Sequence, residues 1–340
     1  MNPNWNTFLA ERGAVFDNDT VSFGARPELA SAESTLMVPL THLGLLRSRG
    51  EDSAPFLHNL FSNDVKKLAP DAAQWNSFNT PKGRMLASFL LWGTPTDHWL
   101  AVSADIQAAV LKKLSMYVLR SKVKLADVAD EFVLIGLTGP LAADLAARGG
   151  LPVPADMRQA AAGGGFIVRL NASAFVLALP VADAPALFDA LQALGAQAAG
   201  TAAWQLAMIR IGVPLITLAT QEEFVAQMLN YELIGGVSFN KGCYPGQEIV
   251  ARTQYLGKLK KRMYRVSIDT DTMPSVGTDL YTPEFGDQSA GKVVNVAPSA
   301  NGGFEALAVM QMSCAEAGEA HLGSPNGPRL AFLELPYALP

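Results

Sequence analysis

The sequence predicts an α+β fold with two mixed α/β domains built on antiparallel sheets, followed by a β-barrel at the carboxy-terminal end. Up to about residue 255, strand-like runs are interrupted by a few helices that each have one apolar face. Beyond Arg262, strand-like runs follow one another across polar turns with no predicted helix between them, which is typical of a barrel or sandwich. With 340 residues, 49% of them hydrophobic, the chain can form two or three cores.

The first hundred residues are expected to hold a hairpin, several strands and one short helix. The hairpin is predicted around residues 17–19, and a single strand over residues 35–46, where β-branched and apolar residues mix. A helix should begin near residues 51–53 and bury Phe56, Leu57, Leu60 and Phe61 on one face. Two or three strands should follow over residues 74–103, broken where Pro and Gly cluster.

A longer amphipathic helix is predicted after residue 104, with Asp105 as its cap. Its apolar stripe is expected to comprise Ile106, Val110, Leu114, Tyr117 and Val118. Lys112, Lys113 and Arg120 lie off this stripe, so the outer side of the helix should be basic.

Residues 131–199 read as a small α+β domain inserted into the first domain. A strand over 132–137, a helix after Gly139-Pro140, two short strands and an Ala-rich helix ending near Leu194 can pack as one unit. The first domain is then discontinuous, comprising residues 1–130 and 200–255, and the barrel comprises residues 256–340.

A further helix is expected over residues 201–212, ending before Pro214. Ala203, Leu206, Ala207 and Ile211 can share its apolar face, with Trp204 beside them.

Composition restricts the possible locations and partners. The chain has no signal-like amino terminus and no run of about 18 apolar residues, so we expect neither secretion nor a membrane span. Its two cysteines are far apart, which fits a reducing, cytoplasmic location. No two of His42, His58, His98 and His321 have metal-ligand spacing, and we assign none of them to a metal site.

The formal net charge of −5 means that nucleic acid would need a local basic patch. Two candidates are residues 112–124 and the cluster of Lys258, Lys260, Lys261, Arg262 and Arg265. Such clusters bind phosphates or form a solvated face, and without interleaved aromatic residues they do not make a nucleic-acid module.

The most informative stretch runs from Asn240 to Arg252. Pro245 suits the first position of a helix, and Glu248 then falls in its first turn. Cys243 would precede the helix, where the dipole together with Lys241 and Arg252 would lower the thiol pKa below its usual value of about 8.5. The stretch predicts a reactive or ligating sulfur. The alternative is a buried cysteine that acts as a small hydrophobic residue.

The segment Lys241-Gly242-Cys243-Tyr244-Pro245-Gly246-Gln247-Glu248, followed by Arg252, resembles the signature of the YgfZ family of folate-binding proteins. Residues 211–214, 227–230 and 235–239 fit the same family, and residues 82–84 and 120–123 match it more weakly. The resemblance extends from about Leu36 to the carboxy terminus, and its specific part runs from Trp204 to Arg262.

This resemblance implies a fold like that of the T-protein of the glycine cleavage system, with the domains placed around a folate-sized opening. It implies tetrahydrofolate or a derivative, including polyglutamylated forms, as cofactor. The implied partners are iron–sulfur enzymes such as tRNA methylthiotransferases, with tRNA affected indirectly. The chain departs from the family at Ala226, where a Pro is expected, and at Asn79-Thr80, where many relatives carry an Asp.

The resemblance also assigns residues to the folate pocket. Trp204 corresponds to a position that contacts folate, and Arg210 can supply a cation for the folate tail. Leu43 occupies the family's other pocket position, which has lost its aromatic residue here, and Gln247 and Glu248 come from the signature. The alternative for Trp204 is core packing on an amphipathic helix.

Three functions follow from these observations. The first is a folate-binding accessory factor for iron–sulfur enzymes, with Cys243 handling sulfur. The second is a tetrahydrofolate-dependent enzyme like the aminomethyltransferases, which rely on a carboxylate near folate and need no thiol in the signature. The third, a scaffold or RNA-binding protein, rests on the basic segments alone.

Overall fold

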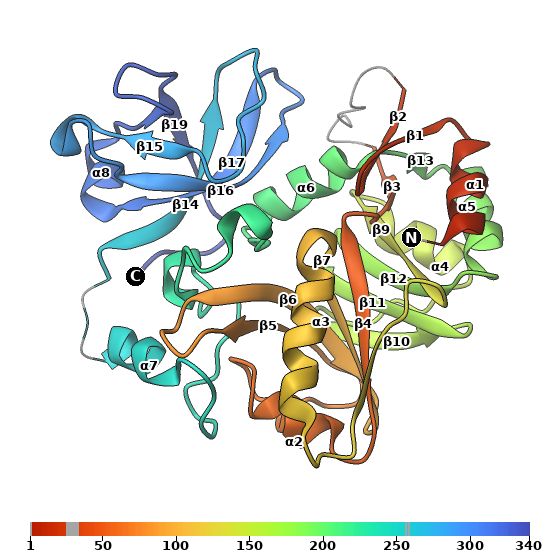
Figure 1. Cartoon of the computed structure of the whole chain (residues 1–340). Coiled ribbons are helices and arrows are strands. Elements are labelled where there is room, and N and C mark those ends of the chain that lie inside the picture. The colour runs from red at the N-terminus through yellow and green to blue at the C-terminus, as the bar shows by residue number, and fades with distance from the viewer. Residues whose placement is uncertain (1, 25–33, 256, 258) are drawn as a thin grey trace. The chain divides into compact units, whose positions relative to one another are not determined.

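The computed structural model describes residues 2–24, 34–255, 257 and 259–340 (Figure 1). The chain forms two compact units, which are treated separately below. The first comprises Met1–Leu57, Val65–Gln74 and Phe89–Trp204, and the second comprises His58–Asp64, Trp75–Ser88 and Gln205–Pro340. The three-domain division of the sequence stays a prediction. Within the described residues, no helix has the length and apolar character needed to cross a membrane.

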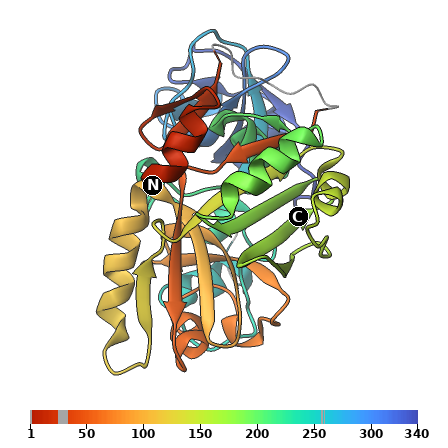
Figure 2. The same ribbon diagram turned by 90° about the vertical axis from the view of Figure 1, so that its right-hand side faces the viewer.

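A six-stranded sheet forms the main core of the first unit. Its order is β10 (Arg158–Ala162), β11 (Gly165–Asn171), β12 (Ala174–Pro180), β9 (Phe132–Thr138), β3 (Leu36–Pro39) and β13 (Gln197–Ala198). All neighbouring strands are antiparallel except β13 and β3. Helices α1 (Pro3–Ala10), α4 (Ala142–Arg148) and α5 (Ala184–Ala193) contribute buried side chains to this core, and α5 lies against the sheet (Figure 2).

A five-stranded antiparallel sheet has the order β5 (Ala73–Asn79), β6 (Met85–Gly93), β7 (Asp97–Ser103), β4 (Leu43–Arg49) and β8 (Lys124–Asp127). Helix α3 (Ala104–Val118) contacts β4, β7 and β8. Aromatic residues connect this sheet to the first one, since the Trp99 ring lies 4.8 Å from that of Phe132 and 5.4 Å from that of Phe166.

The predicted strand over residues 35–46 is wrong as a single element. The chain turns after Leu40, where the amide of Leu43 donates to the Leu40 carbonyl, so that β3 and β4 belong to different sheets. The hairpin around residues 17–19 is confirmed by β1 (Ala14–Asp17) and β2 (Thr20–Phe23). The short helix is confirmed as α2 (Ser53–His58), but it ends before Leu60 and Phe61, which are buried outside the helix, and a 3-10 turn follows over Val65–Lys67.

The long amphipathic helix is confirmed as α3, but two of its details differ from the prediction. Its cap residue is Ser103, and Asp105 lies in the first turn, where its carboxylate accepts a hydrogen bond from the Ser103 hydroxyl. Tyr117 is exposed rather than part of the apolar stripe, because the helix runs past the edge of the surface that it covers.

Helix α6 (Thr201–Arg210) ends two residues before the predicted end and buries only part of the predicted apolar face. Its buried residues are Thr201, Trp204, Leu206 and Ile209, whereas Ala203, Ala207 and Ile211 are only partly buried. The large Trp204 ring determines which side of the helix faces inwards, because it removes far more apolar surface from water than the alanines do.

The carboxy-terminal sheet confirms the predicted barrel. Its order is β18 (His321–Leu322), β15 (Asp279–Tyr281), β16 (Gly291–Pro298), β17 (Phe304–Gln311), β14 (Lys261–Ile268) and β19 (Leu330–Leu333). The sheet curls so far that its two edges meet through a bridge between His321 and Arg329. Sequence analysis missed one short helix here, α8 (Met312–Ala317).

The remaining elements of the second unit are short. They are α7 (Gln247–Tyr255) and 3-10 turns over Leu218–Thr220, Ala226–Leu229 and Pro283–Phe285. The segment before α7 has no regular secondary structure, and it carries the signature identified in the sequence.

Candidate functional site

Cys243 is exposed on the irregular segment that leads into α7. The prediction that Pro245 begins this helix is wrong, because Gly246 has a φ of +81° and the helix starts only at Gln247. Glu248 lies in the first turn, as predicted, and Arg252 lies exposed in the last turn. The cysteine therefore precedes the helix by a short turn.

The signature segment packs against the turn between β5 and β6. A Cβ atom on Gly246 would lie 2.6 Å from both the Gly83 Cα and the Thr80 carbonyl oxygen, which no side chain can tolerate. Gly83 also has a positive φ of +73°, and its amide donates to the Thr80 carbonyl. The strong motif at 241–248 and the weak one at 82–84 therefore form one structural feature.

Lys241 anchors the segment to the chain just after α2. Its ammonium donates to three backbone carbonyls, those of His58, Phe61 and Asn63. It also lies 4.7 Å from the centre of the Tyr244 ring, a cation–π contact. Burial raises the pKa of Tyr244 to about 12, so this ring stays neutral. Lys241 thus fixes the backbone around Cys243, and its predicted effect on the thiol stays a prediction.

His58 lies beside the signature, although sequence analysis assigned no histidine to a site. Its Nδ1 is 3.0 Å from Oδ1 of Asp64, and both side chains are buried. Its Nε2 would lie 3.7 Å from a Cβ placed on Gly242, the residue before Cys243. The sequence around His58 and Asp64 matches no short motif, so nothing in it indicates that these two residues lie beside the signature.

A shallow hollow of about 480 Å³ opens next to Cys243. It is lined by Pro81, Cys243, Tyr244, Pro245, Gly246, Gln247, Glu248 and Ala251. The structure therefore brings Gln247 and Glu248 together with the cysteine. The Gln247 side chain donates to the Lys241 carbonyl, which closes the segment on itself.

Trp204 is only 2% exposed and packs inside the first unit. Its ring lies so close to β9 that a Cβ on Gly136 would be 2.4 Å from it. Leu43, at the start of β4, lines a separate cavity of about 140 Å³ together with Thr41 and Gln107, and Trp204 is not among the described residues that line it.

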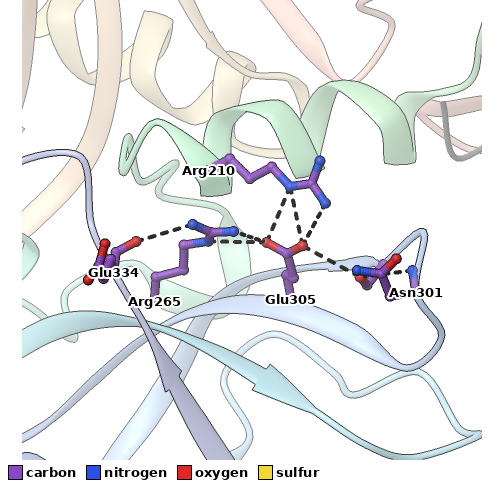
Figure 3. A network of polar contacts seen from close by, with 6 residues as sticks. Arg210, Arg265, Asn301, Glu305 and Glu334 are labelled. Carbon is purple, nitrogen blue, oxygen red and sulfur yellow. Dashed lines mark hydrogen bonds and ion pairs between the residues drawn. The ribbon is translucent and has the colours of Figure 1, made fainter. Parts of the chain in front are cut away.

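Arg210 is held by a carboxylate of the barrel (Figure 3). Its guanidinium donates to Glu305, with Nη2 2.7 Å from Oε1, and Arg265 donates to the same carboxylate from the other side. Burial alone would raise the pKa of Glu305, but the hydrogen bonds and charges of the two arginines lower it. Arg210 therefore joins α6 to β17 within the second unit.

The second basic cluster is not a single exposed patch. Arg262 is buried and forms an ion pair with Glu232, with 2.8 Å between Nη1 and Oε1. Arg265 pairs with Glu305, and Lys258 lies outside the described residues. The two arginines are therefore not available to phosphates. Across the described chain, no group of three or more His, Cys, Asp or Glu residues is placed to hold a metal ion.

Comparisons with known proteins agree with this architecture. Residues 10–157 match the GCVT N-terminal domain family. The chain is 28% identical to the tRNA-modifying protein YgfZ of Photobacterium profundum over 89% of this chain and 92% of the relative. It is also 28% identical to YgfZ of Escherichia coli (strain K12 / DH10B), over 76% of this chain and 80% of the relative.

The solved structure of glycine cleavage system aminomethyltransferase T from Bartonella henselae has a similar fold. The TM-score is 0.78 at 18% identity, and the match covers 98% of this chain and 97% of that one. This similarity confirms the T-protein-like fold that the sequence predicts.

Proposed function

We propose, from its similarity to YgfZ proteins over most of its length, that the chain is a folate-binding accessory factor in tRNA modification that supports iron–sulfur enzymes. The observation that carries the proposal is an exposed Cys243 on a segment that is held in place both before and after the cysteine. Lys241 fixes it through three carbonyls, and Gly246 packs it against the turn at Gly83. A sulfur presented in this way is accessible, yet its position is defined.

The surroundings of Cys243 favour sulfur chemistry over packing. The other cysteine, Cys314, is 1% exposed and lies 3.3 Å from the Thr282 hydroxyl, as expected of a structural residue. Cys243 lines an open hollow that continues along the first turn of α7.

Replacement of each cysteine by alanine tests this role. Cys243→Ala and Cys314→Ala are each expressed in a strain that lacks the protein, and tRNA methylthiolation and iron–sulfur enzyme activity are measured. We expect Cys243→Ala to lose most of the rescue, whereas the control Cys314→Ala keeps it at a matched protein level. Full rescue by Cys243→Ala would refute the role of this sulfur.

The folate part of the proposal rests on polar side chains in the second unit. Asn79 is 2% exposed, and neither Nδ2 nor Oδ1 of its amide has a hydrogen-bond partner among the described residues. Gln227 likewise has a buried Oε1 without a described partner. Such atoms cost about 1–3 kcal/mol each unless a bound molecule or water satisfies them. A pterin edge offers both donors and acceptors, and therefore fits these amides.

The contribution of Arg210 to folate is less than the sequence predicts, because Glu305 already holds its guanidinium. Only the resemblance assigns Trp204 to the folate pocket, because its ring is 2% exposed, and quenching of its fluorescence is the test of that assignment. Saturable quenching by tetrahydrofolate in the intact protein, lost in Trp204→Phe and weakened in Asn79→Leu, is the expected result. Unchanged affinity in both variants would remove the folate proposal and leave the cysteine proposal standing.

A second function, aminomethyl transfer to tetrahydrofolate, is favoured by the fold alone. Asn79 stands where the resemblance places an acidic residue, and an amide cannot accept a proton as a carboxylate does. We expect no methylene transfer when the protein is incubated with tetrahydrofolate and an aminomethyl donor. Turnover above the uncatalysed rate would make transfer the preferred function.

A further inference from the structure

The carboxy-terminal end of α3 carries an exposed apolar cluster formed by Met116, Tyr117 and Leu119. Their exposed fractions are 71%, 41% and 89%. The described part of the chain has nine exposed large hydrophobic residues, and three of them lie within the four positions from Met116 to Leu119. Single exposed apolar residues are ordinary, but a cluster is typical of a surface that binds another molecule.

Leu119 is held in a backbone conformation that suits glycine. Its φ is +44° and its ψ is −104°, a region that costs a side-chain-bearing residue of the L configuration roughly 1–3 kcal/mol. Glycine is the usual residue just beyond a helix end when φ is positive. A leucine here strains the backbone and, being 89% exposed, gains almost nothing from burial. Its presence therefore needs a reason outside the folding of this chain.

Contacts on both sides of Leu119 keep the strained conformation in place. The Ser121 amide donates to the Val118 carbonyl, 2.8 Å away, and the Lys122 amide donates to Oδ2 of Asp52, 2.7 Å away. The Lys122 ammonium also reaches Glu51. These bonds fix the turn against the start of α2, beside the lower end of α3 in Figure 1. The leucine is thus presented on a rigid support, which lowers the entropy lost on binding.

Cations outnumber carboxylates around the apolar cluster. Lys112, Arg120, Lys122 and Lys124 are exposed there, against Glu51, which pairs with Lys122, and Asp52, which borders the same hollow, whereas the chain as a whole has a net charge of −5. Within the described part of the chain, Arg120 has no ion-pair partner, and it borders a hollow with Tyr117 and Leu119. A basic rim around an apolar centre is complementary to an acidic rim around an apolar groove.

We propose that the end of α3, with Leu119 at its centre, is the docking surface for an acidic protein, namely the iron–sulfur tRNA-modifying enzyme that the chain serves. This inference rests on the proposed function and adds the surface that it uses. The aliphatic Leu119 and Met116 favour a protein groove over RNA, because bases bind by stacking on aromatic rings and only Tyr117 is aromatic. Tyr, Arg and Met are also enriched at the centres of protein interfaces.

Two substitutions separate the side chain from the strain. Leu119→Ala removes the apolar group and keeps the backbone conformation strained, whereas Leu119→Gly removes both. We expect each to weaken binding at least tenfold, and only Leu119→Gly to raise the unfolding temperature, by about 2–4 °C. The control is Leu141→Ala, which truncates another exposed leucine of the first unit and should leave binding unchanged.

The probe is a purified iron–sulfur tRNA methylthiotransferase, and its binding to the full-length protein is measured by biolayer interferometry at low and high salt. Arg120→Glu should weaken binding at low salt, with a smaller effect at high salt. Lack of binding by the unaltered protein, or equal binding by the Leu119 variants, overturns the proposal. The proposal is also overturned if the Leu119 variants still bind the enzyme but lose tRNA binding, which would assign the surface to RNA. Loss of self-association with enzyme binding intact would likewise assign the surface to a second copy of the chain.

Rescue of tRNA methylthiolation in cells separates this inference from the proposed function. If Cys243→Ala abolishes rescue and the Leu119 variants do not, the function stands and the docking surface is refuted. If Cys243→Ala keeps full rescue, the proposed role of the sulfur fails on its own account.

Discussion

The signature segment and the end of α3 use their cations in opposite ways. In the signature, Lys241 places its ammonium among three backbone carbonyls, and no part of the sequence near it predicts that arrangement. At the end of α3, Lys112 and Arg120 face solvent. Both regions look alike in sequence, with cations next to aromatic and apolar residues. Lys241 therefore stabilises the fold, whereas Lys112 and Arg120 are available to a partner.

The difference arises from buried acceptors rather than from the cations themselves. A lysine or arginine that is removed from water is stable only where carbonyls or carboxylates surround it, as they do for the partly buried Lys241 and the buried Arg262. Such acceptors come from distant parts of the chain and cannot be read from a local motif.

The largest effect is expected for Lys241→Met. This change leaves the carbonyls of His58, Phe61 and Asn63 without their charged donor, and we expect the free energy of unfolding to fall by about 2–4 kcal/mol. The control Lys112→Met removes an exposed cation and should change it by less than about 0.5 kcal/mol. Urea unfolding of the three proteins measures the difference. Equal stability of the two variants would contradict the anchoring role of Lys241.

Close backbone packing gives the second effect. Gly246→Ala combines an unfavourable φ of +81° with a Cβ atom 2.6 Å from Gly83, so we expect a loss of about 2–3 kcal/mol and displacement of Cys243. Gly235→Ala has a similar φ of +73° but open space around the new atom, and should cost only about 1 kcal/mol. Thermal unfolding compares them. If the two changes cost the same, the contact between the signature and the turn at Gly83 is not tight.

Much of the fold is predictable from local patterns. The strands of the barrel, the hairpin at residues 17–19 and helix α3 follow from alternation, turn residues and helical spacing, all of which act over a few residues. The incorrect prediction of a single strand over residues 35–46 also arises from reliance on local patterns. Both halves are strand-like, and only tertiary pairing assigns them to different sheets.

The site is less predictable because its parts come from distant positions. The signature at 241–248 identified Cys243, but His58 lies next to Gly242 only through the folding of some 180 residues between them. The sequence predicts that Arg210 binds a folate tail. It cannot predict the ion pair with Glu305, because that residue is 95 positions away in the sequence. A motif reports which residue types are present. It does not report which charges the fold neutralises.

Acid stability should distinguish Glu232 and Glu305, two glutamates of the second unit that pair with arginines. The pKa of Glu305 is lowered below its usual value of 4.5, because two arginines outweigh its burial. Its stabilising effect is therefore present above pH 4.5 and is lost as the pH falls below it. The pKa of Glu232 is raised, because burial outweighs the hydrogen bond and charge of Arg262. Its contribution to stability is therefore lost as the pH rises above 4.5, up to its folded pKa.

Glu305→Gln and Glu232→Gln test these opposite signs. Urea unfolding between pH 3 and 7 should show that Glu305→Gln reduces the rise of stability with pH below 4.5. Glu232→Gln should instead reduce a decline above that pH. If both variants change the pH dependence of stability in the same direction, the number of neighbouring arginines does not decide whether the pKa of a glutamate is raised or lowered. Glu305 has two such arginines and Glu232 has one.

The smallest effect is expected where both partners of an ion pair are exposed, as for Lys122 and Glu51 at the end of α3. Their side chains are 71% and 76% exposed, so water screens the 2.9 Å contact and both chains lose rotamer freedom in making it. We expect Lys122→Ala, Glu51→Ala and the double variant to give a coupling energy below about 0.5 kcal/mol, which disappears in 1 M salt. A coupling energy several times larger would show that this ion pair stabilises the strained turn at Leu119, as Lys241 stabilises the signature segment. Lys122 would then not be available to a partner, and the docking surface would have fewer cations.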